Sequence, residues 1–143
     1  ESAGTEGYGY RVEAIQIKIV KKGAQAPGTT EQCFSKKWTS IVYSAHVQDI
    51  GWQKSVKDGA LAGTTGKGKR VEAIKINLTG TLSESCDVYY RVHAQDHGWL
   101  GWTKNGNPAG TEGLSKRIEA IEIKVVTKGD TAPEMGKEAF VKK

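Results

Sequence analysis

The residues of this chain that are best suited to chemistry lie in the heptapeptide HVQDIGW, residues 46–52. Its histidine and aspartate, His46 and Asp49, are residue types that serve as general acids and bases in enzymes. Its tryptophan, Trp52, follows an amide and a carboxylate. That combination suits sugars, because an indole stacks on the C–H face of a sugar ring while polar side chains bind hydroxyls. The heptapeptide returns as HAQDHGW, residues 93–99.

The pattern argues against catalysis. His46 belongs to a stretch that predicts a strand, and Asp49 lies three positions further on, so their side chains point to opposite faces. The sequence contains no nucleophile elbow, no zinc-protease helix motif and no phosphate-binding loop. The two cysteines are too few for a zinc site, and no histidine stands at ligand spacing from them. We therefore expect no enzymatic activity, no catalytic residue, no metal and no cofactor.

Internal repeats dominate the chain. Residues 41–80 align with residues 88–127, and within them AGTTG and KRVEAIKI return as AGTEG and KRIEAIEI. Residues 3–20 carry AGTEG and RVEAIQIKI, which match only the second half of the unit. The N-terminus lacks signal-peptide features, and we expect a chain that starts inside a repeat. We expect one domain, 1–143, with a half-unit at 3–20, a connector at 21–40, full units at 41–80 and 88–127, and a C-terminal connector at 128–143.

Each unit reads as short strands joined by glycine-rich turns. Residues 43–47 alternate in side-chain size, residues 52–56 predict a second short strand, and residues 70–78 predict a longer, β-branched one. The alternation breaks near Ala73, which predicts a β-bulge. Residues 57–69 are rich in glycine and threonine, as tight turns require. No stretch shows a sustained helical period.

A unit of this size cannot bury its apolar face alone, so the units must pack on one another. The sequence therefore predicts an all-β fold with a pseudo-threefold repeat architecture that is β-prism-like, with a β-trefoil-like arrangement as the alternative. The prism is favoured because each unit reads as a small sheet built on one long strand. The missing half of one unit would be replaced by the N-terminal half-unit or by the Phe-x-Lys-Lys segments that end both connectors.

The candidate ligand-binding residues come from the two heptapeptides and the tryptophan after the second. They are Trp52, Trp99, Trp102, His46, His93, His97, Gln48, Gln95, Asp49 and Asp96. Structural alternatives stay open: half-buried histidines bonded to a turn, aspartates that cap the Gly-Trp turn, and tryptophans that anchor the core. Three arginine–glutamate pairs, Arg11 with Glu13, Arg70 with Glu72 and Arg117 with Glu119, each lie on one strand face and predict ion pairs or neighbour-bridging hydrogen bonds.

Trp102 differs from the repeated tryptophans, because the first unit has Ser55 at its position and the fold does not require an indole there. Trp99 and Trp102 are three positions apart and would point to opposite faces of a regular strand, one buried and one exposed. Trp102 is therefore the first candidate for a surface aromatic contact. His97 is a second difference, standing where the first unit has Ile50.

The bulk composition excludes several classes of protein. Of 143 residues, 37% are hydrophobic and 26% are charged, as in a soluble globular domain, and no apolar run is long enough to span a bilayer. The net charge of +5 comes from scattered residues, which indicates a solvated surface or a weak attraction to polyanions such as teichoic acids or acidic glycans. We expect no nucleic acid partner and no membrane insertion. Whether Cys33 and Cys86 form a disulfide stays open.

These motifs together resemble ChW repeats, the clostridial hydrophobic repeats with a hallmark tryptophan. The family pattern is a Tyr-x-x-His-Val-Gln-x-x-Gly-Trp start, an Asp/Asn-Gly turn, an Ala-Gly-Thr-x-Gly loop and an Arg-hydrophobic-Glu-Ala-Ile end. Residues 41–80 and 88–127 match it nearly throughout, and residues 3–20 match its second half. The resemblance implies a secreted or surface-attached protein of a Gram-positive, clostridial bacterium, with the repeats beside lysozyme-type, protease or adhesion domains.

We therefore expect a non-catalytic, extracellular binding module that attaches its parent protein to polysaccharide, with the bacterial cell wall as first choice. The resemblance implies this class of partner and names no ligand. The alternative is a protein-interaction or adhesion module that binds host or partner surface proteins. Glycan binding predicts shallow aromatic sites with weak single-site affinity, whereas protein binding predicts a contiguous apolar patch of roughly 800 Å².

Overall fold

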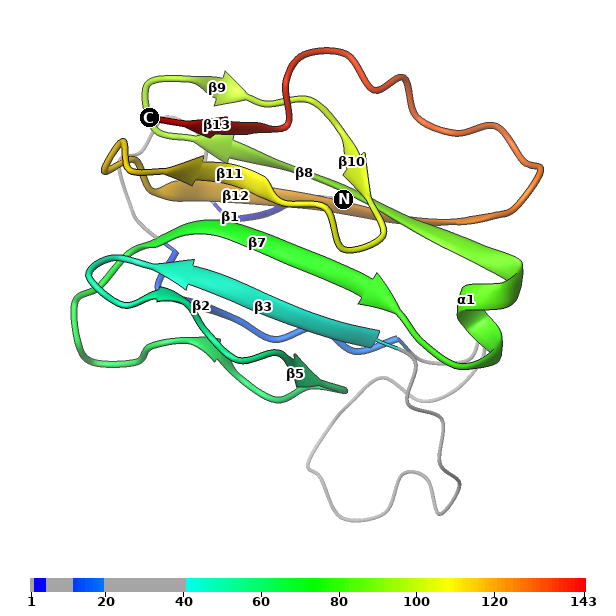
Figure 1. Cartoon of the computed structure of the whole chain (residues 1–143), viewed down its shortest axis with the longest axis horizontal. Coiled ribbons are helices and arrows are strands. Elements are labelled where there is room, and N and C mark those ends of the chain that lie inside the picture. The colour runs from blue at the N-terminus through cyan, green and yellow to red at the C-terminus, as the bar shows by residue number, and fades with distance from the viewer. Residues whose placement is uncertain (1, 5–11, 20–40) are drawn as a thin grey trace.

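The computed structural model describes residues 2–4, 12–19 and 41–143 and is built mainly of β-strands. They are β1 (Ser2–Gly4), β2 (Ala14–Ile15), β3 (Ile41–Val47), β4 (Gly51–Trp52), β5 (Val56–Lys57), β6 (Ala62–Gly63), β7 (Val71–Leu78), β8 (Cys86–Ala94), β9 (Gly98–Trp99), β10 (Thr103–Lys104), β11 (Ala109–Glu112), β12 (Ile118–Thr127) and β13 (Phe140–Lys142), with a short helix, α1 (Thr81–Ser85), between β7 and β8. The predicted all-β class is confirmed (Figure 1).

Each full unit is built on one long antiparallel strand pair. β3 pairs with β7 in the first unit and β8 pairs with β12 in the second, and Figure 1 shows the second pair above the first. The short strands β4 and β5 add to β3, and β9 and β10 add to β8 at matching positions. The strand predicted over residues 52–56 is interrupted, because β4 and β5 are separated by residues 53–55.

A β-bulge falls on the strand glutamate of each full unit. In β7, Val71 and Ala73 pair with adjacent residues of β3, which leaves Glu72 outside the ladder, and Glu119 is passed over in the same way in β12. The bulge predicted near Ala73 is therefore confirmed, one residue earlier. The extra residue explains why residues 71–74 are all buried, although a regular strand would alternate.

The three copies of the repeat are joined in a closed cycle of strand pairs. Each Ala-Gly segment pairs with the strand of another copy that carries the Glu-Ala-Ile motif: β6 with β2, β11 with β7, and β1 with β12. Backbone bonds follow the same path, from Val12 N–H to the Ile118 carbonyl at 3.1 Å and from Val71 N–H to the Val12 carbonyl at 2.9 Å. The N-terminal half-unit thus supplies a strand to the second full unit, as one of the two predicted arrangements requires. A pseudo-threefold fold needs this connectivity. Whether its shape is prism-like or trefoil-like stays a prediction.

Two tyrosines are the largest fully buried side chains, and each joins its unit to another copy. The Tyr43 hydroxyl accepts a hydrogen bond from the Ile17 N–H of the half-unit at 3.2 Å and donates to a turn carbonyl of its own unit. The Tyr90 hydroxyl accepts from the Ile76 N–H of the first full unit at 3.0 Å and also donates to a turn carbonyl. Each buried hydroxyl is therefore satisfied as both donor and acceptor.

Burial raises the pKa of the Tyr90 hydroxyl from 10.0 to about 12. The unfolded chain loses this proton near pH 10 and the folded protein retains it, so we expect the free energy of unfolding to fall between these values, by up to about 1.4 kcal/mol per pH unit. Urea unfolding of the wild type and Tyr90→Phe at about pH 9 and about pH 11 measures this contribution. The variant should be less stable at the lower pH, because Ile76 loses its acceptor, and should show a smaller alkaline fall. The same fall in both proteins would contradict the prediction.

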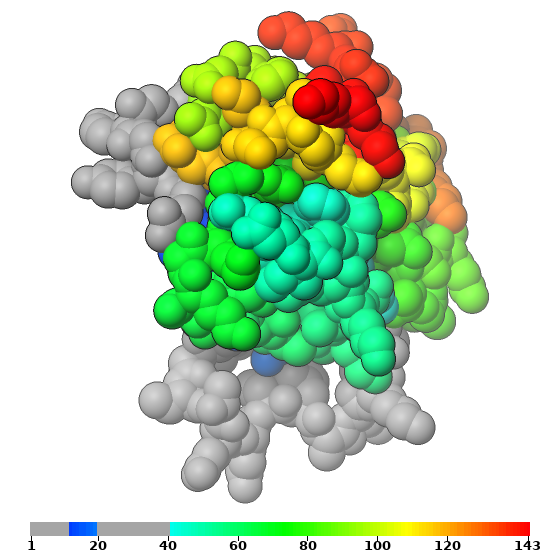
Figure 2. Space-filling model, turned by 60° about the vertical axis from the view of Figure 1, so that its left-hand side comes forward, coloured from blue at the N-terminus to red at the C-terminus, as the bar shows by residue number. Residues whose placement is uncertain are grey.

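The C-terminal connector ends in a strand that covers an edge. β13 runs parallel to β11, and the Gly110 N–H donates to the Ala139 carbonyl at 2.9 Å; Figure 2 shows the red chain end against the yellow residues of β11. In the first unit a side chain binds the backbone of the equivalent glycine. The Gln53 Oε1 accepts from the Gly63 N–H at 2.7 Å, and the Gln53 Nε2 donates to the Gly63 carbonyl at 3.2 Å. The second unit has Leu100 in place of that glutamine, and β13 supplies the missing hydrogen bonds.

Candidate functional site

Trp52 lies at the contact between the two full units. Its half-buried ring meets the His46 ring edge-on at 5.4 Å, and the Lys75 Nζ lies 4.2 Å from its centre. Its Nε1–H donates to the Glu112 carboxylate of the second unit at 3.2 Å, and the Phe140 ring of β13 lies 6.5 Å away. These contacts hold Trp52 in the architecture, so it is closer to the core alternative than to a free ligand contact.

Trp99 and Trp102 are both half-buried, and both rings lie beside the same guanidinium, that of Arg91. The Arg91 Cζ lies 4.7 Å from the Trp99 ring centre and 5.0 Å from that of Trp102, and the Lys124 Nζ lies 5.2 Å from Trp102. The prediction that the two indoles point to opposite faces is wrong. β9 ends at Trp99, and residues 100–102 do not continue as a regular strand.

The two indoles line a pocket of about 510 Å³. One part of its lining comes from β8, β12, β9 and the segment after β9, through Arg91, Lys124, Trp99 and Trp102. The other part comes from residues 133–137. We call residues 128–139, which connect β12 to β13, the C-terminal strap.

Backbone hydrogen bonds hold the C-terminal strap against the segment after β9, so that the strap forms one side of the pocket. The N–H groups of Gly101 and Trp102 donate to strap carbonyls at 3.1 and 2.9 Å. A Cβ on Gly101 would lie 1.7 Å from the Lys137 carbonyl oxygen, so only glycine allows this approach. The first unit has Lys54 at the same position, so the repeat itself does not require a glycine there. Gly101 therefore serves the strap.

The repeated histidines, glutamates and arginines form matching ion-pair clusters. The buried Glu72 carboxylate contacts Arg70 at 2.8 Å and the His46 Nδ1 at 3.2 Å. The second unit repeats these contacts at 2.9 and 3.2 Å with Arg117, Glu119 and His93. The predicted pairs of Arg70 with Glu72 and of Arg117 with Glu119 are confirmed. Arg11 of the third predicted pair lies outside the described residues. The histidines are half-buried as the structural alternative predicts, but they face a glutamate of the neighbouring strand instead of a turn.

The aspartates of the two heptapeptides lie on exposed turns and bind lysine. Asp49 accepts from the Lys69 Nζ at 3.0 Å, and Asp96 accepts from the Lys116 Nζ at 2.6 Å. These lysines lower the pKa of both carboxyl groups. Both aspartates have positive φ angles, 59° and 62°, which places them in the turn as predicted. Their carboxylates hydrogen-bond to lysine side chains, whereas the structural alternative expects them to cap the turn N–H groups.

Of the ten candidate residues, the structure brings Trp99 and Trp102 together at the pocket. The Gln95 side chain accepts from the arginine of the ion-pair cluster at 3.1 Å. His97 is exposed, with its Nδ1 3.0 Å from the carbonyl of Gln95 in the same turn. These two residues do not line the pocket, and Gln48 belongs to the other unit.

Sequence reasoning missed the cations that line the pocket. Arg91 stands where the first unit has Ser44, and Lys124 stands where it has Asn77. Trp102 is singled out by the same kind of difference between the two copies. The comparison that found Trp102 could therefore also have found these two cations. The docking of the C-terminal strap has one signal of this kind, Gly101 in place of Lys54, although the strap itself lies outside the repeat.

Among the residues that the structure describes, no group of histidine, cysteine, aspartate and glutamate side chains could hold a metal ion. Those residues also contain no helix with the length and apolar character needed to cross a membrane. Cys86 carries a half-buried free thiol. Cys33 and the connector at 21–40 lie outside the described residues.

Comparison with known proteins identifies the repeat. No curated protein and no solved structure matches the chain. The family model described as Clostridial hydrophobic W matches residues 1–21, 46–80 and 93–127, which together make up more than half of the chain. These stretches overlap the half-unit and the two full units, and they include both ion-pair clusters and both Gly-Trp pairs. The chain therefore belongs to the family of clostridial hydrophobic W repeats, as its motifs predict.

Proposed function

We propose that this protein is a non-catalytic, extracellular binding module that attaches its parent protein to polysaccharide, with the bacterial cell wall as first choice. The observation that carries the proposal is the pocket in which Trp99 and Trp102 lie beside each other. Two indoles offer stacking faces for sugar rings, and the pocket volume of about 510 Å³ is in the range of small-ligand sites.

The arrangement of the titratable side chains supports a role without catalysis. A general acid or base must reach a substrate. The buried glutamates of both units, Glu72 and Glu119, instead contact an arginine and a histidine of their own cluster. The cluster is the same in both full units, whereas the pocket described above is lined by residues of the second unit and of the C-terminal strap. The shared cluster therefore belongs to the architecture, and the difference between the units belongs to binding.

The exposed apolar side chains favour a glycan over a protein partner. Among the described residues, the exposed large hydrophobic side chains belong to four different segments and are Ile50, Leu61, Val125 and Met135. Apolar residues that are exposed singly are normal on soluble proteins, whereas a protein partner usually needs a contiguous patch. A small aromatic pocket is the more distinctive feature of this surface.

A pull-down on purified wall sacculi, with a glycan array beside it, tests the proposal. We expect the wild type to bind and Trp102→Ser to bind about tenfold more weakly or worse, because an indole at the centre of a site contributes more than about 1.4 kcal/mol. Serine is the residue of the first unit at this position, so the variant should fold. Ser55→Ala, at the equivalent exposed position of the first unit, is the matched control and should bind like the wild type.

Two results would count against the proposal. If the wild type binds neither sacculi nor any glycan on the array, polysaccharide is the wrong class of ligand. If folded Trp102→Ser binds as tightly as the wild type, the pocket beside this tryptophan is the wrong site. Circular dichroism of each variant shows that it is folded.

A further inference from the structure

We infer that the pocket beside Trp99 and Trp102 takes an anionic sugar, one that carries a carboxylate or a phosphate group on or next to the ring that stacks on the indoles. The inference rests on the proposed function and names the class of saccharide. It comes from the charges that line the pocket.

Cations stand against the aromatic faces of this pocket. Arg91 contacts both indoles through its guanidinium, at 4.7 and 5.0 Å, and the Lys124 ammonium lies 5.2 Å from the Trp102 ring. A sugar stacked on either indole therefore lies within reach of a positive charge. Such an arrangement suits a ring whose substituent is an anion.

Positive charges outnumber negative ones at this pocket. The charged lining residues are three cations, Arg91, Lys124 and Lys137, and one acid, Glu134. The Arg91 Nε is bound to Glu122 at 2.5 Å, which orients the guanidinium beside the rings. Neither lysine forms an ion pair with another residue in the described part of the chain. The lining therefore keeps an excess of positive charge.

The two copies of the repeat show that the architecture does not demand these cations. The first unit has Ser44 and Asn77 where the second has Arg91 and Lys124. The first unit keeps the same long strand pair with those neutral residues. The cations are therefore additions to the shared scaffold, and they occur in the copy that also has the second indole.

Carboxylate and phosphate are the anionic groups that arginine and lysine bind best, and both occur in saccharide polymers. The test uses three polymers as probes. Polygalacturonate carries one carboxylate on each sugar, its methyl ester has the same backbone without the charge, and a phosphomannan carries phosphate on its sugar rings. Calorimetric titration of the full chain with each polymer measures the binding constants. Polygalacturonate against its ester shows the effect of the charge, and polygalacturonate against the phosphate polymer compares the two anionic groups.

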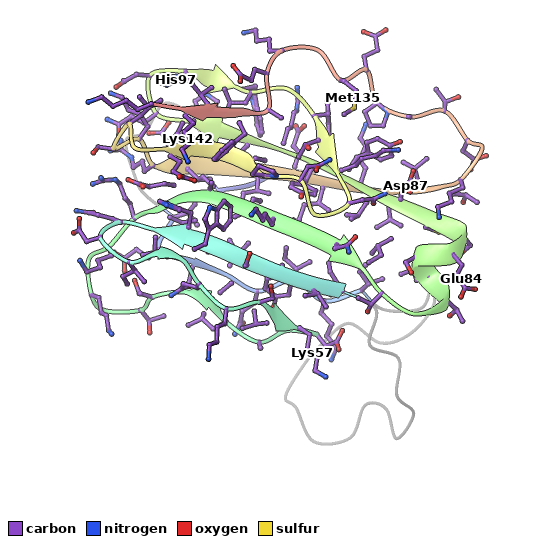
Figure 3. All side chains as sticks on the ribbon, viewed as in Figure 1. Lys57, Glu84, Asp87, His97, Met135 and Lys142 are labelled. Atoms are coloured by element: carbon purple, nitrogen blue, oxygen red, sulfur yellow. The ribbon has the colours of Figure 1, made fainter. Side chains whose placement is uncertain are left out.

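The key variant is Lys124→Asn, which installs the residue of the first unit. We expect one or both polyanions to bind at least about fivefold more tightly than the methyl ester, and Lys124→Asn to weaken that binding by about threefold to fivefold. Its binding to the ester should be unchanged. The control Lys57→Asn has the same net charge and alters an exposed lysine, far from Met135 of the strap (Figure 3), so it should bind like the wild type.

Each other result overturns the inference in a distinct way. Equal binding of polygalacturonate and its ester would show that charge is not selected, while the polysaccharide function would stand. Polyanion binding that Lys124→Asn and Lys57→Asn weaken equally would assign the effect to overall charge. If neither polyanion binds, the inference is wrong, and the sacculus pull-down decides separately whether the proposed function survives.

Discussion

Gly110→Ala should abolish or nearly abolish folding, with a loss of more than about 4 kcal/mol in the free energy of unfolding. Gly110 has a φ of 126°, which side chains rarely adopt, and a Cβ there would lie 2.3 Å from the Glu72 carbonyl oxygen. That oxygen belongs to the backbone of β7, which pairs with β11. It cannot move without separating the two full units, and small domains are stable by only about 5–15 kcal/mol.

Two matched variants separate the steric overlap from the backbone strain. Gly63→Ala should be as severe, because this glycine has a φ of 116° and its added Cβ would lie 2.3 Å from the Glu13 carbonyl oxygen of the half-unit. Gly98→Ala should cost only about 1 kcal/mol, because its φ is 71° and nothing lies within 4 Å of the added Cβ. Thermal unfolding followed by circular dichroism measures all three. A Gly110→Ala protein as stable as Gly98→Ala would mean that the units do not depend on this close approach.

Gly101→Ala should detach the C-terminal strap while the two full units stay folded. The added Cβ would overlap the Lys137 carbonyl oxygen at 1.7 Å, and the strap can relieve the overlap by moving outward because it is exposed. The backbone bonds from Gly101 and Trp102 would then be lost, and with them the strap side of the pocket. We expect a loss of about 1–3 kcal/mol in stability and binding to sacculi at least about tenfold weaker.

Limited trypsin digestion gives a direct reading of the strap. Cleavage after Lys137 should be about tenfold faster in Gly101→Ala, because a released segment is accessible to the protease. Lys54→Ala changes the equivalent position of the first unit, where the residue is exposed, and should leave cleavage after Lys137 and binding to sacculi unchanged. A Gly101→Ala protein that is digested at the wild-type rate and binds normally would show that the strap does not form part of the site.

Much of the fold follows from local pattern. The alternation and β-branched residues of residues 70–78 predict β7, and the break near Ala73 predicts the bulge now seen at Glu72. The spacing of Arg70 and Glu72 predicts their ion pair. These features succeed because strand periodicity acts over a few neighbouring residues. The five-residue helix α1 has no such periodic signal, because it is too short to present an apolar face.

The candidate site could be predicted only in part. Trp102 was singled out because its counterpart is Ser55, and it does line the pocket. The relation between Trp99 and Trp102 was predicted wrongly, since the rule of alternating faces holds only where the strand continues. The sequence does not decide whether Trp52 belongs to the core or to a ligand site, because its bond to Glu112 depends on a residue of the other unit. Long-range partners of this kind have no local pattern.

The sequence by itself determined the repeat, the all-β class, the turns and the residues shared by both units, because these depend on periodicity and on residue types at fixed spacing. The tertiary structure decided where the site lies. Pairing of β8 with β12 brings Arg91 near Lys124, and the strap adds Met135 through backbone bonds to a segment more than 30 residues earlier. Proximity of this kind is set by strand register and by close backbone approach at Gly101. HVQDIGW and HAQDHGW are therefore mainly parts of the scaffold, and the pocket combines the shared Trp99 with residues that differ between the two copies and with the C-terminal strap.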